Sequence, residues 1–129
     1  MCKSSLSLGI DLGTSGVRIA VVNKSRNVIY SSNIYYERGL NFPEDWKKSC
    51  EILIKRLPLE VRESITGIAV DATSGTLVAC MKNGTPLNKA LPYNLSCPEQ
   101  KSQINTLGIN QGPESFPNGS LARAFRLIN

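Results

Sequence analysis

The alternation of apolar and polar stretches near the start of the chain predicts three strands. Apolar residues dominate positions 6–10, 17–22 and 28–36, and glycine-rich or polar stretches separate these three runs. Apolar runs rich in β-branched and aromatic residues and bounded by turn formers are typical of strands. Because the connections between them are short, we expect the three strands to form an antiparallel meander.

The apolar positions that follow recur with a helical period instead. They lie at i, i+4, i+7, i+8 and i+11, which places them on one face of a helix. The residues concerned are Trp46, Cys50, Leu53, Ile54 and Leu57. Pro43 followed by two acidic residues is typical of a first helical turn. We therefore expect a helix at 43–57 whose apolar face packs against the sheet.

A fourth strand is predicted at 65–70, after a weakly marked helical stretch at 59–63. The run Ile68-Ala69-Val70 shows no polar alternation, which is typical of a strand covered on both faces. We therefore expect this strand in the middle of a covered sheet. In the resulting βββαβ order the helix crosses over the sheet, so we expect the fourth strand to lie parallel to the first, by a right-handed connection.

The remainder of the chain predicts a hairpin and two short helices. Strands at 77–81 and 87–94 flank an Asn-Gly turn, and we expect this hairpin to be antiparallel and near the sheet edge. Helices are predicted at 100–107 and 121–128, the second with Ser120 as its N-cap. Because the chain stops with the last helix barely finished, we expect a truncated protein.

Composition indicates an ordinary globular domain. The chain has 129 residues, of which 41% are hydrophobic and 19% charged, and this balance is typical of one folded domain. The four cysteines form no CxxC pair and histidine is absent, which argues against a zinc site or a disulfide framework. Neither a signal peptide nor a run long enough to span a bilayer is evident. We expect a cytoplasmic protein that does not bind membranes.

The net charge of +5 raises the question of nucleic-acid binding. The basic residues are scattered without a long run, and the few aromatic residues do not alternate with them. A binding surface for single strands needs such stacking platforms. We therefore expect no nucleic-acid partner, and a basic nucleic-acid binder stays only a weak third hypothesis.

Two turns of the same type end the first and fourth strands. Asp11 precedes Leu-Gly-Thr-Ser-Gly, and Asp71 precedes Ala-Thr-Ser-Gly-Thr. Gly13 and Gly16 allow close backbone approach to an anion, and successive N–H groups of such turns bind phosphate oxygens. Parallel neighbouring strands end at the same edge, where α/β sheets bind ligands. We expect Asp11 and Asp71 to face one crevice; plain turns with a capping aspartate are the alternative.

The chemistry of the first turn fits nucleotide phosphates. Thr14 and Ser15 add hydroxyl donors, and Asp11 could hold Mg²⁺ through water, because that ion keeps much of its hydration shell. The turn is not a Walker P-loop, since it has no lysine and a strand follows it.

Two stretches resemble a known family. Residues 9–22 resemble the first phosphate motif of the actin-like ATPase superfamily. The run ITGIAVDATSGTLVACMKNGTPLNKALPYN is similar to FGGY carbohydrate kinases, in particular to the ribulose and xylulose kinase-like branch. The resemblance covers nearly all of 6–94 and, more loosely, the terminal SLARAFRLI. It implies an α/β, actin-like ATPase (ribonuclease H-like) fold, with 1–129 an incomplete N-terminal domain and a second, nucleotide-binding domain missing.

The resemblance also implies a reaction and its residues. A kinase of this family moves the γ-phosphoryl group of ATP, with Mg²⁺, to a small-molecule sugar, here a ketopentose such as ribulose or xylulose. The residues implied in phosphate and Mg²⁺ binding are Asp11, Gly13, Thr14 and Ser15. The residues implied in sugar binding are Thr14, Asp71, Thr73 and Ser74, with Ser74 the best candidate for a direct contact.

The sequence departs from the family in two ways. The family usually has an aspartate after the aromatic-Asn pair, where this chain has Leu95, so a sugar contact is in doubt. The resemblance also implies a catalytic base aspartate that we expect beyond Asn129, and no context of this kind surrounds Asp45. The isolated chain is therefore expected to be inactive without the C-terminal portion of the kinase. The alternative is a non-catalytic module of the same fold that binds a sugar or a partner.

Overall fold

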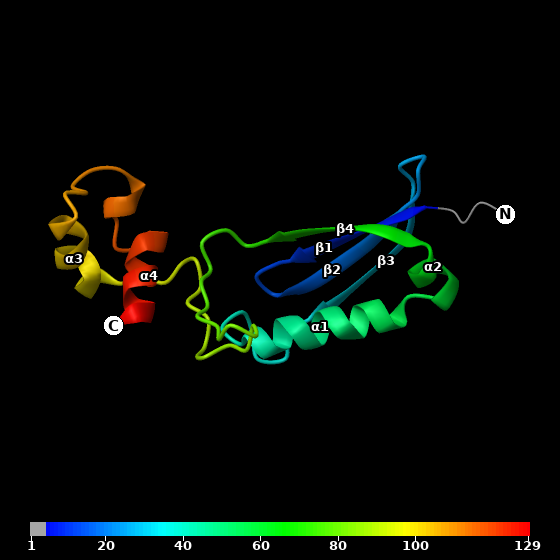
Figure 1. Cartoon of the computed structure of the whole chain (residues 1–129), viewed down its shortest axis with the longest axis horizontal. Helices are drawn as coiled ribbons and strands as arrows, with labels where there is room; N and C mark the ends of the chain where they lie inside the picture. The colour runs from blue at the N-terminus through cyan, green and yellow to red at the C-terminus, as the bar shows by residue number, and fades with distance from the viewer. Residues whose placement is uncertain (1–4) are drawn as a thin grey trace. The chain divides into compact units, whose positions relative to one another are not determined.

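The computed structural model describes residues 5–129, and the chain divides into two compact units, Met1–Thr73 and Ser74–Asn129. In its described residues, the first unit consists of a four-stranded sheet with the order β3-β2-β1-β4 and two helices (Figure 1). Its elements are β1 (Leu6–Leu12), β2 (Gly16–Val22), β3 (Val28–Tyr35), α1 (Pro43–Arg56), α2 (Leu59–Glu63) and β4 (Ile65–Ala72).

The pairing of the strands confirms the predicted meander and crossover. β2 is antiparallel to both β1 and β3, whereas β4 is parallel to β1. β1 and β4 each continue beyond the predicted strand ends, so Asp11 and Asp71 each lie one residue before the end of a strand. The register pairs Asp11 directly with Asp71 on β4 and with Arg18 on β2.

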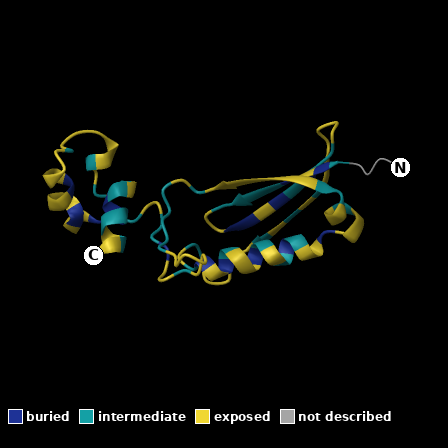
Figure 2. Cartoon of the chain, viewed as in Figure 1, coloured by how far each residue is buried: buried dark blue, intermediate teal, exposed yellow. Residues whose placement is uncertain are grey.

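The core of the first unit lies between the sheet and α1. The predicted apolar face of α1 is correct: Leu53 and Leu57 are buried, and Trp46, Cys50 and Ile54 pack around them. The stripe of buried positions on α1 faces the sheet (Figure 2). Burying this face supplies the main stabilisation of a short amphipathic helix.

The expectation that the fourth strand is covered and central is wrong. β4 is an edge strand, and the side chains of Ile68 and Val70 are exposed. They pair with Leu8 and Ile10 of β1 and therefore point toward the same side of the sheet as α1. The helix, however, lies over β2 and β3. An unbroken apolar run thus predicts a strand correctly, but it does not tell whether a helix reaches it.

Asp45 joins the loop before α1 to the first turn of the helix. Its carboxylate is buried and accepts hydrogen bonds from the backbone N–H of Arg38 at 2.8 Å and from Nε of the same residue at 2.9 Å. The Arg38 guanidinium lies 4.5 Å from the centre of the Phe42 ring. These bonds from Arg38 hold the pKa of Asp45 below its ordinary value. Asp45 is therefore a structural residue, as its sequence context indicated.

This ion pair predicts a particular response of stability to acid. The pKa of Asp45 is lower in the folded than in the unfolded chain. The stabilisation that its ion pair gives to the folded state is therefore complete above the ordinary aspartate pKa of about 4. This stabilisation is lost as the pH falls through the pKa that Asp45 has in the folded chain. We expect Asp45→Asn to melt at a lower temperature at neutral pH and to lose less stability than the wild type below about pH 5.

Thermal unfolding followed across this pH range checks the prediction. Glu63→Gln makes the same chemical change on the exposed surface of α2 and should keep the wild-type pH profile. An Asp45→Asn profile parallel to that of the wild type would show that another carboxylate dominates the acid response.

In the second unit, the predicted hairpin is antiparallel but does not form regular strands. Leu77 and Leu91 exchange two backbone hydrogen bonds, and an isolated bridge joins Cys80 to Pro86. The hairpin is not one of the strands of the four-stranded sheet. Pro86 and Pro92 interrupt the ladder because proline has no N–H to donate.

Short helices make up the rest of the second unit. They are η1 (Pro98–Gln100), α3 (Lys101–Thr106), η2 (Pro113–Ser115) and α4 (Ser120–Ile128). The prediction that Ser120 caps the last helix is wrong, because Gly119 occupies the N-cap and Ser120 is the first helical residue. None of the described helices is long and apolar enough to cross a membrane.

A buried arginine ties the second unit together. The Arg123 side chain donates from Nε to the carbonyl oxygen of Gly75 at 2.9 Å and from Nη1 to those of Leu95 and Asn118. A buried charge is tolerated only when it is hydrogen-bonded in this way. Arg123 therefore links α4 to the segments around Gly75 and Leu95, which are distant in sequence, and to the loop at Asn118 that directly precedes the helix.

Candidate functional site

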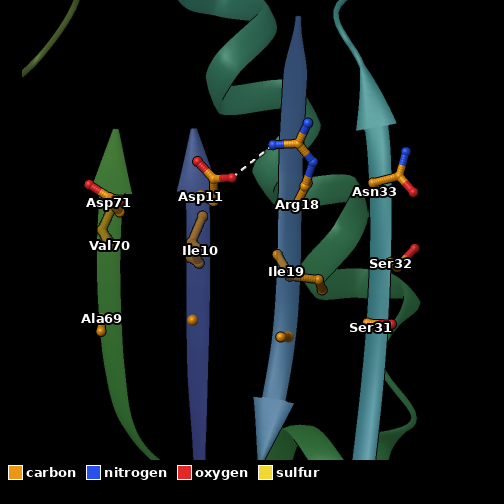
Figure 3. A pocket seen from close by; sticks show the side chains of 12 residues that line it. Ile10, Asp11, Arg18, Ile19, Ser31, Ser32, Asn33, Ala69, Val70 and Asp71 are labelled. Atoms are coloured by element: carbon orange, nitrogen blue, oxygen red, sulfur yellow. Dashed lines mark hydrogen bonds and ion pairs between the residues drawn. The ribbon is translucent and has the colours of Figure 1, made fainter. Parts of the chain in front are cut away.

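Four polar side chains form a row across the sheet, one from each strand (Figure 3). The register places Asp71 of β4 beside Asp11 of β1, then Arg18 of β2 and Asn33 of β3. Leu8 faces the core, so strand alternation places Asp11 on the face of the sheet away from α1. The row lines one end of a hollow of about 610 Å³.

The floor of this hollow is made of small residues. Two residues along the strands from the polar row, on the same face of the sheet, Gly9 of β1 lies beside Ala69 of β4 and Ala20 of β2, and Ala20 lies beside Ser31 of β3. All four line the hollow. Short side chains here leave the space next to the two aspartates open.

Asp11 is paired with a cation that the sequence interpretation missed. Nη1 of Arg18 donates to Oδ2 of Asp11 at 2.9 Å, and both side chains remain about half exposed or more, at 64% for Arg18 and 48% for Asp11. Both groups are therefore accessible to a ligand. Counting residues back from the hairpin turn would have identified Arg18 as the cross-strand neighbour of Asp11.

Asp71 combines a local bond with an accessible carboxylate. Its Oδ1 accepts a hydrogen bond from the N–H of Ala72 at 2.9 Å, as the capping alternative proposed. Within the described residues, the other oxygen accepts no hydrogen bond from the protein. Asp71 is exposed and lies directly beside Asp11. The expectation that the two aspartates face one crevice is confirmed by their register and by the hollow that both of them line.

The glycine turn after β1 presents its tip to solvent. The N–H of Gly13 donates to the carbonyl oxygen of Gly16 at 2.9 Å, and Thr14 and Ser15 between them are exposed. In the part of the chain that the structure describes, the N–H groups of Thr14 and Ser15 have no protein acceptor. Consecutive free N–H groups and hydroxyls in a glycine turn form a site suited to a phosphate oxygen.

The second predicted turn is divided between the two units. The N–H of Thr73 donates to the carbonyl oxygen of Leu12 at 3.1 Å, which fixes the end of β4 next to β1. Ser74 belongs to the second unit. There it lines a hollow of about 370 Å³ with Tyr93 and Arg123, among others.

Leu95, where the resemblance led us to expect an aspartate, packs as an apolar residue. Its side chain lies against the buried cluster of Cys97, Ile104 and Ala122. Its carbonyl oxygen accepts a hydrogen bond from Arg123. In this chain, position 95 therefore contributes to the core of the second unit.

The donor set at the polar row fits a magnesium ion. The described residues hold no cluster of three or more metal-binding side chains. Asp11 and Asp71 nevertheless place two carboxylates side by side. Mg²⁺ is commonly bound by one or two carboxylates together with water and substrate phosphates. The site therefore suits a metal ion that arrives with a nucleotide.

Curated relatives in sequence are sugar kinases. The chain is 34% identical over 97 residues to a xylulose kinase from Staphylococcus epidermidis, and the match covers 67% of this chain. It spans only 20% of the length of that relative. No family model matches the chain.

Solved structures agree on the fold. A xylulose kinase from Rhodospirillum rubrum matches 79% of this chain and 23% of its own with a TM-score of 0.67 at 16% identity. A glycerol kinase from Plasmodium falciparum, solved with ADP, matches 86% of this chain and 24% of its own with a TM-score of 0.64 at 13% identity. In sequence and in fold, the chain fits an N-terminal part of a carbohydrate kinase of the FGGY family.

Proposed function

We propose that this chain supplies the phosphate- and sugar-binding part of an ATP-dependent sugar kinase. The observation that carries the proposal is the direct pairing of Asp11 with Asp71 at the ends of parallel β1 and β4. This pair lies beside a glycine turn with free N–H groups. Phosphoryl transfer depends mainly on positioning and on stabilisation of the phosphate charge, and this arrangement offers both.

In this proposal the site residues of the first unit have distinct roles. Gly13, Thr14 and Ser15 hold phosphate oxygens through backbone N–H groups and hydroxyls, and Asp11 holds the water shell of Mg²⁺. Arg18 keeps Asp11 in place and offers its exposed guanidinium to the phosphates. The metal ion supplies neutralisation of the phosphate charge. The ADP in the glycerol kinase of the same fold supports a nucleotide as ligand.

The proposed sugar is a ketopentose, because the curated relatives are xylulose kinases. Thr14, Asp71, Thr73 and Ser74 carry the hydroxyl and carboxylate groups that sugar hydroxyls require as partners. Asp71 has an accessible carboxylate, and Ser74 lines the hollow of the second unit.

We place the catalytic base outside these 129 residues. Of the three aspartates in the chain, Asp11 and Asp71 serve the phosphates and the sugar in this proposal, and Asp45 is bound to Arg38. We likewise propose that the domain that binds the rest of the nucleotide lies in the remaining part of a kinase. That remaining part would be the physiological partner of residues 1–129.

A binding and turnover screen of the purified chain tests this function. We expect the melting temperature to rise with Mg·ATP and, separately, with xylulose or ribulose, because ligands that bind only the folded state stabilise it. Glycerol should have a smaller effect, and no sugar-dependent ADP should form. Stabilisation by sugar without any by Mg·ATP would favour the non-catalytic sugar-binding module. Sugar-dependent ADP formation that Asp11→Ala abolishes would show that the base lies within the chain.

A further inference from the structure

Tyr36, the residue after β3, makes two hydrogen bonds to the glycine turn. Its hydroxyl donates to the carbonyl oxygen of Gly13 at 3.1 Å. Its backbone N–H donates to the carbonyl oxygen of Ser15 at 3.0 Å. One residue from another part of the chain thus holds two of the peptide groups that make up the turn.

These bonds determine where the turn directs its donors. In a trans peptide, the C=O of one residue and the N–H of the next point in opposite directions, and the described chain has no cis peptide. When Tyr36 holds the C=O of Gly13, the N–H of Thr14 must point away from Tyr36. This N–H is one of the two at the tip without a protein acceptor, so the bond leaves it directed outward for a ligand.

The surroundings of Tyr36 favour this contact. Tyr36 as a whole is only 9% exposed and belongs to the same buried cluster as Val17 and Leu53. Burial, with smaller contributions from Cys50 and Asp11, raises the pKa of Tyr36 to about 12. The hydroxyl therefore keeps its proton, and can donate it to Gly13, throughout the neutral pH range.

We propose that Tyr36 is a positioning residue that holds the glycine turn in its phosphate-binding conformation. The proposal rests on the proposed function in one respect, namely that the ligand of the turn is a nucleotide phosphate. A buried tyrosine needs some hydrogen-bond acceptor in any protein. Tyr36 differs in that its two bonds go to two carbonyl groups of one short turn, those of Gly13 and Ser15. The N–H groups at the tip of this turn have no protein acceptor among the described residues.

The test is Tyr36→Phe in the full chain, with Tyr35→Phe as the matched control. The control removes a hydroxyl from the neighbouring residue, which is 71% exposed. Two quantities are measured for each variant: hydrogen exchange of individual amides by NMR, and the affinity for Mg·ADP. In Tyr36→Phe, we expect the Gly13 amide to exchange about 5- to 10-fold faster and the affinity to fall about 5- to 10-fold, as for the loss of one hydrogen bond. Amides in the centre of the sheet, such as those of Leu8 and Val21, should exchange as in the wild type.

Each outcome decides either the role of Tyr36 or the function of the turn. Tyr35→Phe should change neither quantity. Unchanged Gly13 exchange in Tyr36→Phe, or equally faster exchange throughout the sheet, would overturn the positioning role and leave Tyr36 a core residue. Faster Gly13 exchange with undiminished affinity would overturn it as well. If the wild type binds no Mg·ADP, the proposed function fails, whereas the exchange data still decide whether Tyr36 holds the turn.

Discussion

We expect Gly16→Ala to destabilise the first unit by about 3 kcal/mol, the upper part of the range for inserting atoms into a packed site. A Cβ at this position would overlap the carbonyl oxygen of Ile34 and lie 2.8 Å from Cα of Tyr35. Both atoms belong to the backbone of β3, so they cannot move aside as a flexible side chain would. The substitution must therefore separate β2 from β3 next to the glycine turn.

Gly67→Ala provides the matched control within the same sheet. A Cβ there meets only Oγ of Ser7 at 3.9 Å, an ordinary contact. We expect no loss of stability and a gain of up to about 1 kcal/mol, because alanine restricts the unfolded chain. Denaturant unfolding followed by the fluorescence of the single tryptophan, Trp46 in α1, reports on the first unit. Equal stability of the two variants would contradict the close approach of β2 and β3.

The second large effect is expected from Asp11→Asn. The affinity for Mg·ADP should fall about 10- to 100-fold, the usual loss when an outer-shell partner of a metal is removed. The substitution also frees Arg18 from its ion pair. An unpaired guanidinium attracts phosphate, so binding of ADP without Mg²⁺ should be unchanged or tighter. The loss is therefore confined to the metal-bearing nucleotide.

Calorimetric titrations with Mg²⁺ and with a chelator separate these two effects. Glu63→Gln removes the same charge from α2, which precedes the start of β4 rather than its end, and should bind like the wild type. Equal losses of affinity with and without Mg²⁺ would contradict a metal-binding role for Asp11. The carboxylate would then act through the conformation of the turn.

Much of the first unit follows from local patterns in the sequence. The three antiparallel strands, the buried face around Leu53 and the parallel fourth strand were predicted correctly. The proximity of Asp11 and Asp71 followed from that topology, because parallel neighbours end at one edge. Periodicity and connection length carry this information, since each depends on residues close together in the chain.

The features that the sequence interpretation missed depend on contacts between distant residues. The exposure of Ile68 depends on how far α1 extends over the sheet, which no periodicity within β4 reports. The bond from the Tyr36 hydroxyl to Gly13 joins positions 23 residues apart. Arg123 is buried because carbonyl groups from three segments meet it, whereas a charged residue on a short helix is normally expected at the surface.

Mapping Mg·ADP binding onto the amide NMR spectrum of the chain tests the central claim most directly. The claim is that the glycine turn and the neighbouring strand ends of β1 and β4 bind nucleotide phosphates. It predicts saturable shifts that are largest for Gly13, Thr14 and Ser15 and smaller for Asp11 and Asp71, with the amides of α2 unmoved. Shifts confined to other parts of the chain, or no saturable shift at the turn, would contradict it.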